Sequence, residues 1–204
     1  MEFLWDQSRR AFTDAAEWFV RTAGLVGDRW DEPGLGEWDV RALVGHTSRS
    51  FLTVETYLAR PAEAVEVATA LEYFRATSAV AAGPAVAARG RDAGTALGDD
   101  PAAAVAEIAA RVLRLVQARA GTELLTTIVG GMRLADYLPT RTFELAVHTA
   151  DLATALGVPL EVPATAATQA LHLVADLAVV EGLAGPLLLA ATGRPALPAR
   201  FSVL

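Results

Sequence analysis

The feature that most constrains this chain is a helical spacing of apolar residues, repeated in several segments that end at glycine or proline. Residues three and four apart share one side of an α-helix, so the pattern predicts helices that each bury one face. Alanine, which supplies about a fifth of the chain, and arginine both favour helix. We expect a mainly α protein whose longer helices form a bundle. Helices are expected over residues 2–24, 38–59, 62–82, 85–97, 101–119, 139–156 and 164–191, the last interrupted near residue 185.

Two stretches between these helices carry turn signals. A loop is expected over 28–36, which contains a proline and two glycines. Residues 124–129, LLTTIV, are rich in β-branched side chains and precede Gly130-Gly131. This pattern is compatible with a small hairpin or with an extended lead-in to the next helix. Asp39 stands near the start of the second helix, where an acid suits the positive end of the helix dipole.

Charge and cysteine content limit the functions open to the chain. All 17 basic residues are arginine, and 24 acidic residues give a net charge of −7, so no basic face for nucleic acid is indicated. Cysteine is absent, which excludes disulfides, thiolate metal ligands and a cysteine nucleophile. The N-terminal segment is too charged for a signal peptide, and no segment offers the ~18 uncharged apolar residues of a membrane helix. We expect a cytoplasmic protein that binds neither nucleic acid nor membrane.

The most informative segment is residues 141–151, RTFELAVHTAD. At about 100° per residue, Arg141, Glu144, His148 and Asp151 form a polar stripe directly beside the apolar stripe of the same helix. This placement is unusual, because a solvated face normally lies opposite the core. Since Glu144 and His148 are four residues apart, a carboxylate oxygen and an imidazole nitrogen can reach one common ion.

The other two residues of this stripe have supporting roles in the same hypothesis. Asp151 can orient the imidazole of His148 through a hydrogen bond. Arg141 can pair with Glu144 or contact an anionic ligand. A simpler interpretation also fits these residues, in which Glu144 and His148 form a helix-stabilising pair at the surface.

His46 is the natural third ligand. It lies in WDVRALVGHTSRS, at the flank of the apolar stripe of its helix, and Gly45 beside it leaves room for another helix or a ligand. Alternatively, His46 is a boundary histidine bonded to neighbouring backbone. His172, with Asp176 one turn later, is interpreted as a surface or interface residue. No G-x-S-x-G motif is present, which disfavours a serine hydrolase.

Two motifs together resemble a known family. G-E-W-D-V-R-A-L-V-G-H at 36–46 and R-T-F-E-L-A-V-H-T-A-D-L at 141–152 are similar to the mycothiol-dependent maleylpyruvate isomerase family, which belongs to the DinB-like superfamily of four-helix-bundle metalloproteins. The W-D-E-P-G-L loop at 30–35 fits as well. The resemblance implies a DinB-like metal-binding bundle over 1–158. A short helical and extended C-terminal extension would follow over 159–204, truncated relative to the α/β domain appended in the isomerase itself.

The resemblance also implies the chemistry of the site. In the family, residues at the positions of His46, Glu144 and His148 bind a divalent metal, usually zinc. Two imidazoles and one carboxylate leave an open position on tetrahedral Zn²⁺, as catalytic sites do. The resemblance implies mycothiol as the thiol cosubstrate, activated as thiolate for transfer to, or isomerisation of, a small electrophilic substrate. Imidazoles of His46 and His148 more than ~10 Å apart would exclude a shared ion, whose bonds are ~2 Å long.

Two other functions are compatible with the sequence. One is a metal-dependent hydrolase, in which the ion lowers the pKa of a bound water. The other is a non-enzymatic ligand-binding helical bundle whose metal site is vestigial. The identity of the electrophile, the physiological metal and the choice between a monomer and a homodimer are left open by the sequence.

Overall fold

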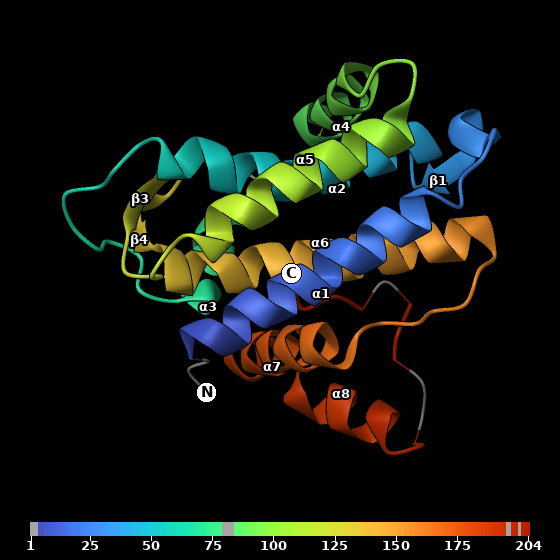
Figure 1. The fold of residues 1–204 in the computed structure, drawn as a ribbon. Helices are drawn as coiled ribbons and strands as arrows, with labels where there is room; N and C mark the ends of the chain where they lie inside the picture. Colours follow the sequence, from blue (N-terminus) through green and yellow to red (C-terminus); the bar gives the residue numbers. More distant parts are fainter. Residues whose placement is uncertain (1–3, 79–83, 195–196, 200) are drawn as a thin grey trace.

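Four helices run side by side along a common axis in the computed structural model, which describes residues 4–78, 84–194, 197–199 and 201–204 (Figure 1). Both α1 and α2 pack against both α5 and α6, so the four helices enclose one core. This arrangement confirms the mainly α helical bundle that the sequence predicts. The four helices are α1 (Trp5–Ala23), α2 (Val40–Leu58), α5 (Pro101–Gln117) and α6 (Leu134–Leu156).

The core is filled by the apolar stripes of these helices. Phe51 of α2 packs against Phe12 and Phe19 of α1, with ring centroids 6.0 Å and 6.1 Å apart. The apolar stripe of α6 is buried along its whole length, and burial of such side chains is the main favourable term in folding. The buried residues of this stripe are Leu138, Thr142, Leu145, Thr149, Leu152 and Leu156. The polar stripe of α6 therefore starts at the rim of the core.

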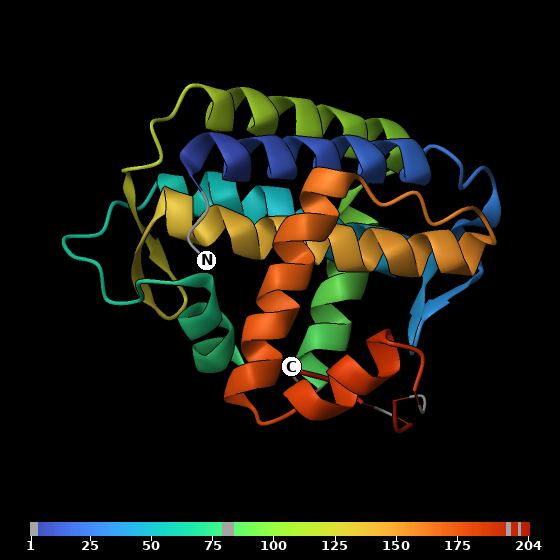
Figure 2. The ribbon, with the colours of Figure 1, turned by 90° about the horizontal axis from the view of Figure 1, so that it is seen from below.

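Shorter elements cover the bundle. Helix α7 (Ala164–Val180) crosses α1 and α6 steeply, as Figure 2 shows, and α8 (Ala184–Ala191) follows it. Helix α3 (Ala70–Thr77) packs against α6 and α7, whereas α4 (Pro84–Ala96) packs against α2. Leu173 and Leu177 of α7 belong to the same buried hydrophobic cluster as the side chains of the bundle. The predicted division of the chain into a bundle over 1–158 and an extension over 159–204 stays a prediction. Among the helices described, none is long and apolar enough to cross a bilayer.

Two small antiparallel hairpins connect the helices. The expected loop over 28–36 contains a 3-10 turn, Arg29–Asp31, and strand β1 (Pro33–Leu35), which pairs with β2 (Trp38–Asp39). Strand β3 (Leu124–Thr127) pairs with β4 (Gly130–Arg133), which confirms the hairpin alternative for this region.

The prediction of a helix over 62–82 is wrong for residues 62–69, which are not helical. The backbone of residues 60–67 is bonded to the β3–β4 hairpin instead: the amide of Glu66 donates to the carbonyl of Gly131 at 2.8 Å. The amide of Gly131 in turn donates to the Glu66 carboxylate at 2.7 Å. Backbone groups used in this way are not available for helical hydrogen bonds. Helix α3 therefore begins after this contact, where the hydroxyl of Thr69 caps its N-terminus.

The start of α6 also differs from the prediction. The helix was expected from Pro139, but it begins at Leu134, directly after β4, and Pro139 lies inside it. Proline has no N–H, so the carbonyl of Ala135 loses its regular helical partner. Leu134 is fully buried, and the apolar surface that this extra turn buries offsets that loss. Residues 79–82, at the end of the predicted third helix, lie outside the described residues.

Glycines allow α4 to lie directly against α2. A Cβ atom on Gly45 would come within 2.1 Å of the backbone nitrogen of Gly94, and one on Gly94 within 2.7 Å of the carbonyl oxygen of Arg41. Glycine weakens a helix in isolation, but here it lets two backbones touch. Because Gly45 is next to His46, this contact sets how closely α4 approaches that histidine.

We expect Gly45→Ala to lower the free energy of unfolding by about 1–3 kcal/mol, because the added methyl group overlaps the backbone of α4. Urea denaturation measures the effect. Gly185→Ala is the control, since a Cβ atom there meets nothing within 4 Å. Equal stability of the two variants would contradict the close contact between α2 and α4.

Candidate metal centre

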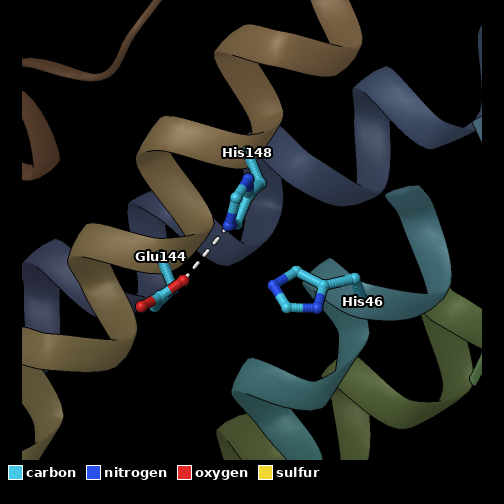
Figure 3. Close-up of side chains that lie close together, drawn as sticks. All are labelled: His46, Glu144 and His148. Carbon is cyan, nitrogen blue, oxygen red and sulfur yellow. Dashed lines mark ion pairs between the residues drawn. The ribbon is translucent and has the colours of Figure 1, made fainter. Parts of the chain in front are cut away.

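Three residues named from the sequence come together between α2 and α6. His46 projects from α2, and Glu144 and His148 project from successive turns of α6 (Figure 3). One potential ligand atom from each lies within 4.8 Å of the other two, and the two imidazole centroids are 4.9 Å apart. This separation is well below the ~10 Å that would exclude a shared ion. The structure thus brings the three side chains together, and metal binding by them stays a prediction.

Local helix register explains this convergence. The side chain of Asp39 caps α2 by accepting a hydrogen bond from the amide of Ala42 at 2.7 Å, as expected for an acid at this position. With the apolar stripe of α2 facing the core, His46 lies at its edge. On α6, Glu144 and His148 flank the buried stripe, and their side chains are 23% and 17% exposed. The cluster therefore lies at the rim of the bundle, where a solute can reach it.

Two carboxylates hold the imidazole of His148. Its Nε2 atom lies 3.2 Å from Glu144, and its Nδ1 atom lies 3.1 Å from Asp151. An imidazole whose Nδ1–H donates to a carboxylate presents Nε2 for other interactions. The structure thus places Asp151 against His148, and its orienting role stays a prediction.

The surroundings give the two histidines opposite charge states. Burial and, to a lesser extent, the neighbouring His148 together lower the pKa of His46 to about 4. Burial also lowers the pKa of His148, but the hydrogen bonds that its ring donates to Asp151 and Glu144 outweigh this effect and raise it to about 9. Desolvation raises the pKa of Glu144, whereas His148 and Arg141 lower it to about 2. At neutral pH the neutral imidazole of His46 therefore faces an ion pair between protonated His148 and ionised Glu144.

The chemistry of this donor set fits a divalent metal such as zinc. Figure 3 shows one ring nitrogen of His46 pointing toward the pair formed by Glu144 and His148. The other ring nitrogen of His46, Nδ1, is buried and has no hydrogen-bond partner within the described ranges. Two imidazole nitrogens and one carboxylate oxygen are ligands that catalytic zinc sites use.

A family model described as the mycothiol maleylpyruvate isomerase N-terminal domain matches residues 8–153, more than two thirds of the chain. The chain belongs to this family. Its bundle of α1, α2, α5 and α6 is DinB-like, as the sequence motifs indicated. The matched range includes His46, Glu144 and His148. No curated protein and no solved structure matches the chain.

In this member of the mycothiol maleylpyruvate isomerase family, Arg141 is a buried neighbour of the cluster. Its guanidinium lies over the rings of Tyr73 and Tyr137, 5.4 Å and 5.0 Å from their centroids. The Nε atom donates to the hydroxyl of Thr140 at 2.9 Å, and a terminal nitrogen lies 4.0 Å from Glu144. Arg141 is therefore buried beside Glu144, and the choice between pairing with Glu144 and contact with an anionic ligand stays a prediction.

Sequence reasoning missed the aromatic residues around the cluster. The indole of Trp38 lies against the imidazole of His46, with ring centroids 4.5 Å apart. Trp38 belongs to β2 and Tyr73 to α3, so no helical periodicity connects either residue with α6. The available signal was the position of Trp38 in the same motif as His46. His172 lies outside the cluster, on α7, with Nδ1 2.7 Å from the carbonyl oxygen of Thr168.

Arg141→Ala tests which role this arginine has. Because the side chain fills the space between two tyrosine rings, we expect its removal to lower the free energy of unfolding by about 2–4 kcal/mol. Arg141→Met should cost less, since its aliphatic chain refills part of the space. Urea denaturation measures both changes. If Arg141→Ala lowers the free energy of unfolding by less than about 0.5 kcal/mol, Arg141 is instead a surface residue that is available to ligands.

Proposed function

We propose that this chain is a zinc-dependent enzyme that uses mycothiol as a thiol cosubstrate, for transfer to a small electrophilic substrate or for isomerisation of it. The observation that carries the proposal is the convergence of His46, Glu144 and His148 at the solvent-accessible rim of the bundle. The family model adds the thiol, because it is named for a mycothiol maleylpyruvate isomerase. Another divalent metal would serve the same role.

The proposed ligands are the Glu144 carboxylate and one nitrogen each from His46 and His148. Three protein ligands leave one position of a tetrahedral ion open. When bound, zinc stabilises the thiolate form of a coordinated thiol, which is the nucleophilic form. The chain contains no cysteine, so the thiol has to come from a cosubstrate.

Residues around the ligands prepare the site. Asp151 holds the imidazole of His148 in one orientation through Nδ1, so that Nε2 faces the position shared with Glu144. Arg141 lies beside Glu144 and favours its ionised form. His46 is neutral at neutral pH and needs to lose no proton before it binds an ion. His148, by contrast, is protonated at neutral pH and has to release one proton when an ion binds, because only the neutral imidazole is a metal ligand.

The proposed reaction is addition of the thiol across a carbon–carbon double bond. The sulfur forms a bond to one carbon, and the proton of the thiol is delivered to the other. The adduct is the product of transfer. Rotation about the former double bond, followed by elimination of the same thiol, returns the cosubstrate and an isomerised alkene. Neither outcome requires an oxidant or a reductant.

We expect the wild-type protein to bind one equivalent of zinc, and His46→Ala or His148→Ala to lose it, as measured by elemental analysis. Zinc at a hundredfold excess over its Kd should stabilise the wild type by about 2.7 kcal/mol, and this gain should vanish in both variants. His172→Ala is the matched control and should retain the metal. Full zinc content in His148→Ala would refute the site. A wild type that neither binds zinc nor gains stability from it would indicate a non-enzymatic bundle.

Titration of the zinc-loaded protein with mycothiol should release heat at millimolar or lower concentrations, because the thiol sulfur would be a further ligand for an ion held by His46, Glu144 and His148. The S-methylated thiol is the control ligand and should bind far more weakly. Turnover of electrophiles, with maleylpyruvate as the first to be assayed, should require the thiol. Absence of heat at millimolar mycothiol would contradict the proposal, and turnover that is independent of thiol would indicate the metal-dependent hydrolase.

A further inference from the structure

We infer that Trp38 is a positioning residue that couples the docking of α4 to the ligand geometry of His46. The inference rests on the proposed metal site and adds a residue outside the proposed set of ligands. The observation behind it is a continuous series of contacts from α4 through the Trp38 indole to the His46 imidazole.

His46 is held by rings on two sides. The indole of Trp38 lies 4.5 Å away with an angle of 33° between the ring planes, and the imidazole of His148 meets it edge-on at 4.9 Å and 86°. A histidine that binds a metal usually donates its second ring nitrogen to a hydrogen-bond acceptor, which fixes the ring. His148 has Asp151 in this role, whereas Nδ1 of His46 has no partner in the part of the chain that the structure describes. Ring contact with Trp38 therefore replaces the missing hydrogen bond in fixing His46.

Helix α4 holds the indole in turn. The Nε1 atom of Trp38 donates to the carbonyl of Ala87 at 3.0 Å. Gly90, three residues later on α4, lies so close that a Cβ atom there would be 2.6 Å from the indole ring. Any side chain at Gly90 would displace the indole or the helix. The position of the indole over His46 thus depends on where α4 docks.

Coupling of this kind acts in both directions. If docked α4 favours the orientation of His46 that binds the ion, then ion binding has to favour docking of α4 by the same free energy. We therefore expect zinc to slow amide hydrogen exchange in the backbone of α4. Removal of the indole should weaken zinc binding about 10- to 100-fold, the range found when groups that orient metal ligands are lost.

The protein offers a matched control in Trp5. Its Nε1 atom donates to the carbonyl of Arg119 at 3.1 Å, and a Cβ atom on Gly121 would lie 2.6 Å from its ring. Trp5 therefore has the same kind of anchoring as Trp38, but at the start of α1. Trp5→Ala should lose comparable packing and leave zinc affinity within about threefold of the wild type.

The experiment compares Trp38→Ala, Trp38→Phe, Gly90→Ala and Trp5→Ala with the full-length wild type. Zinc affinity is measured by competition with a chromogenic chelator, and the visible spectrum of the Co²⁺-substituted protein reports ligand geometry. Trp38→Ala should bind zinc 10- to 100-fold more weakly and alter the cobalt spectrum. Trp38→Phe keeps a ring over His46 and should recover much of the affinity. It lacks the bond to Ala87, so zinc should no longer slow hydrogen exchange in α4.

The outcomes separate this inference from the proposed function. A wild type without zinc affinity would overturn the proposed function and the inference together. A folded Trp38→Ala variant with unchanged affinity and cobalt spectrum would overturn the inference alone. If Trp38→Ala does not fold, Trp38→Phe and Gly90→Ala decide. Zinc-dependent protection of α4 that is unchanged in both would overturn the coupling, and its loss in both would support it.

Discussion

Burial of one continuous apolar stripe of α6 is the constraint on which the rest of the structure depends. This helix packs against α1 and α2 within the bundle and against α3 and α7 outside it. Once this apolar stripe faces the core, the 100° step between successive residues also fixes the direction of the polar stripe beside it. Glu144 and His148 have to lie at the rim, next to α2. The packing of α6 therefore determines where two of the three proposed ligands lie.

At this rim, burial and access to solvent are balanced. Full burial of Glu144 and His148 would make their charges very costly, whereas full exposure would leave the pair weak and mobile. Their side chains are instead about one fifth exposed, and each is supported by a neighbour: Arg141 for the carboxylate, Asp151 for the imidazole. His46 is supported differently, by the indole of Trp38. The site is therefore built by local pairing on α6 and by ring packing on α2.

Sequence reasoning succeeded where the signal is local. Helical periodicity predicted α1, α2 and α5 closely, because each buries one face of a regular helix. The break in the last helical region was predicted near residue 185, but it lies between Val180 and Ala184, and Gly185 and Pro186 belong to the first turn of α8, where a proline N–H is not needed. Sequence reasoning failed over residues 62–69, whose composition favours helix but whose backbone is bonded to a hairpin more than fifty residues away. It also placed the start of α6 at Pro139, because the first turn is stabilised by burial and not by a capping residue. In both cases tertiary contacts outweighed local preference.

The sequence by itself determined that this is a mainly helical chain without cysteine thiols. It also determined that Glu144 and His148 share one side of a helix, because the number of residues between two positions of a helix fixes the angle between their side chains. The motif with His46 indicated the family. Only the tertiary structure decided that His46 meets that pair, that Arg141 is buried between two tyrosines and that Trp38 links α4 to His46. These contacts join residues distant in the chain, and packing between helices, which no periodicity encodes, sets their distances.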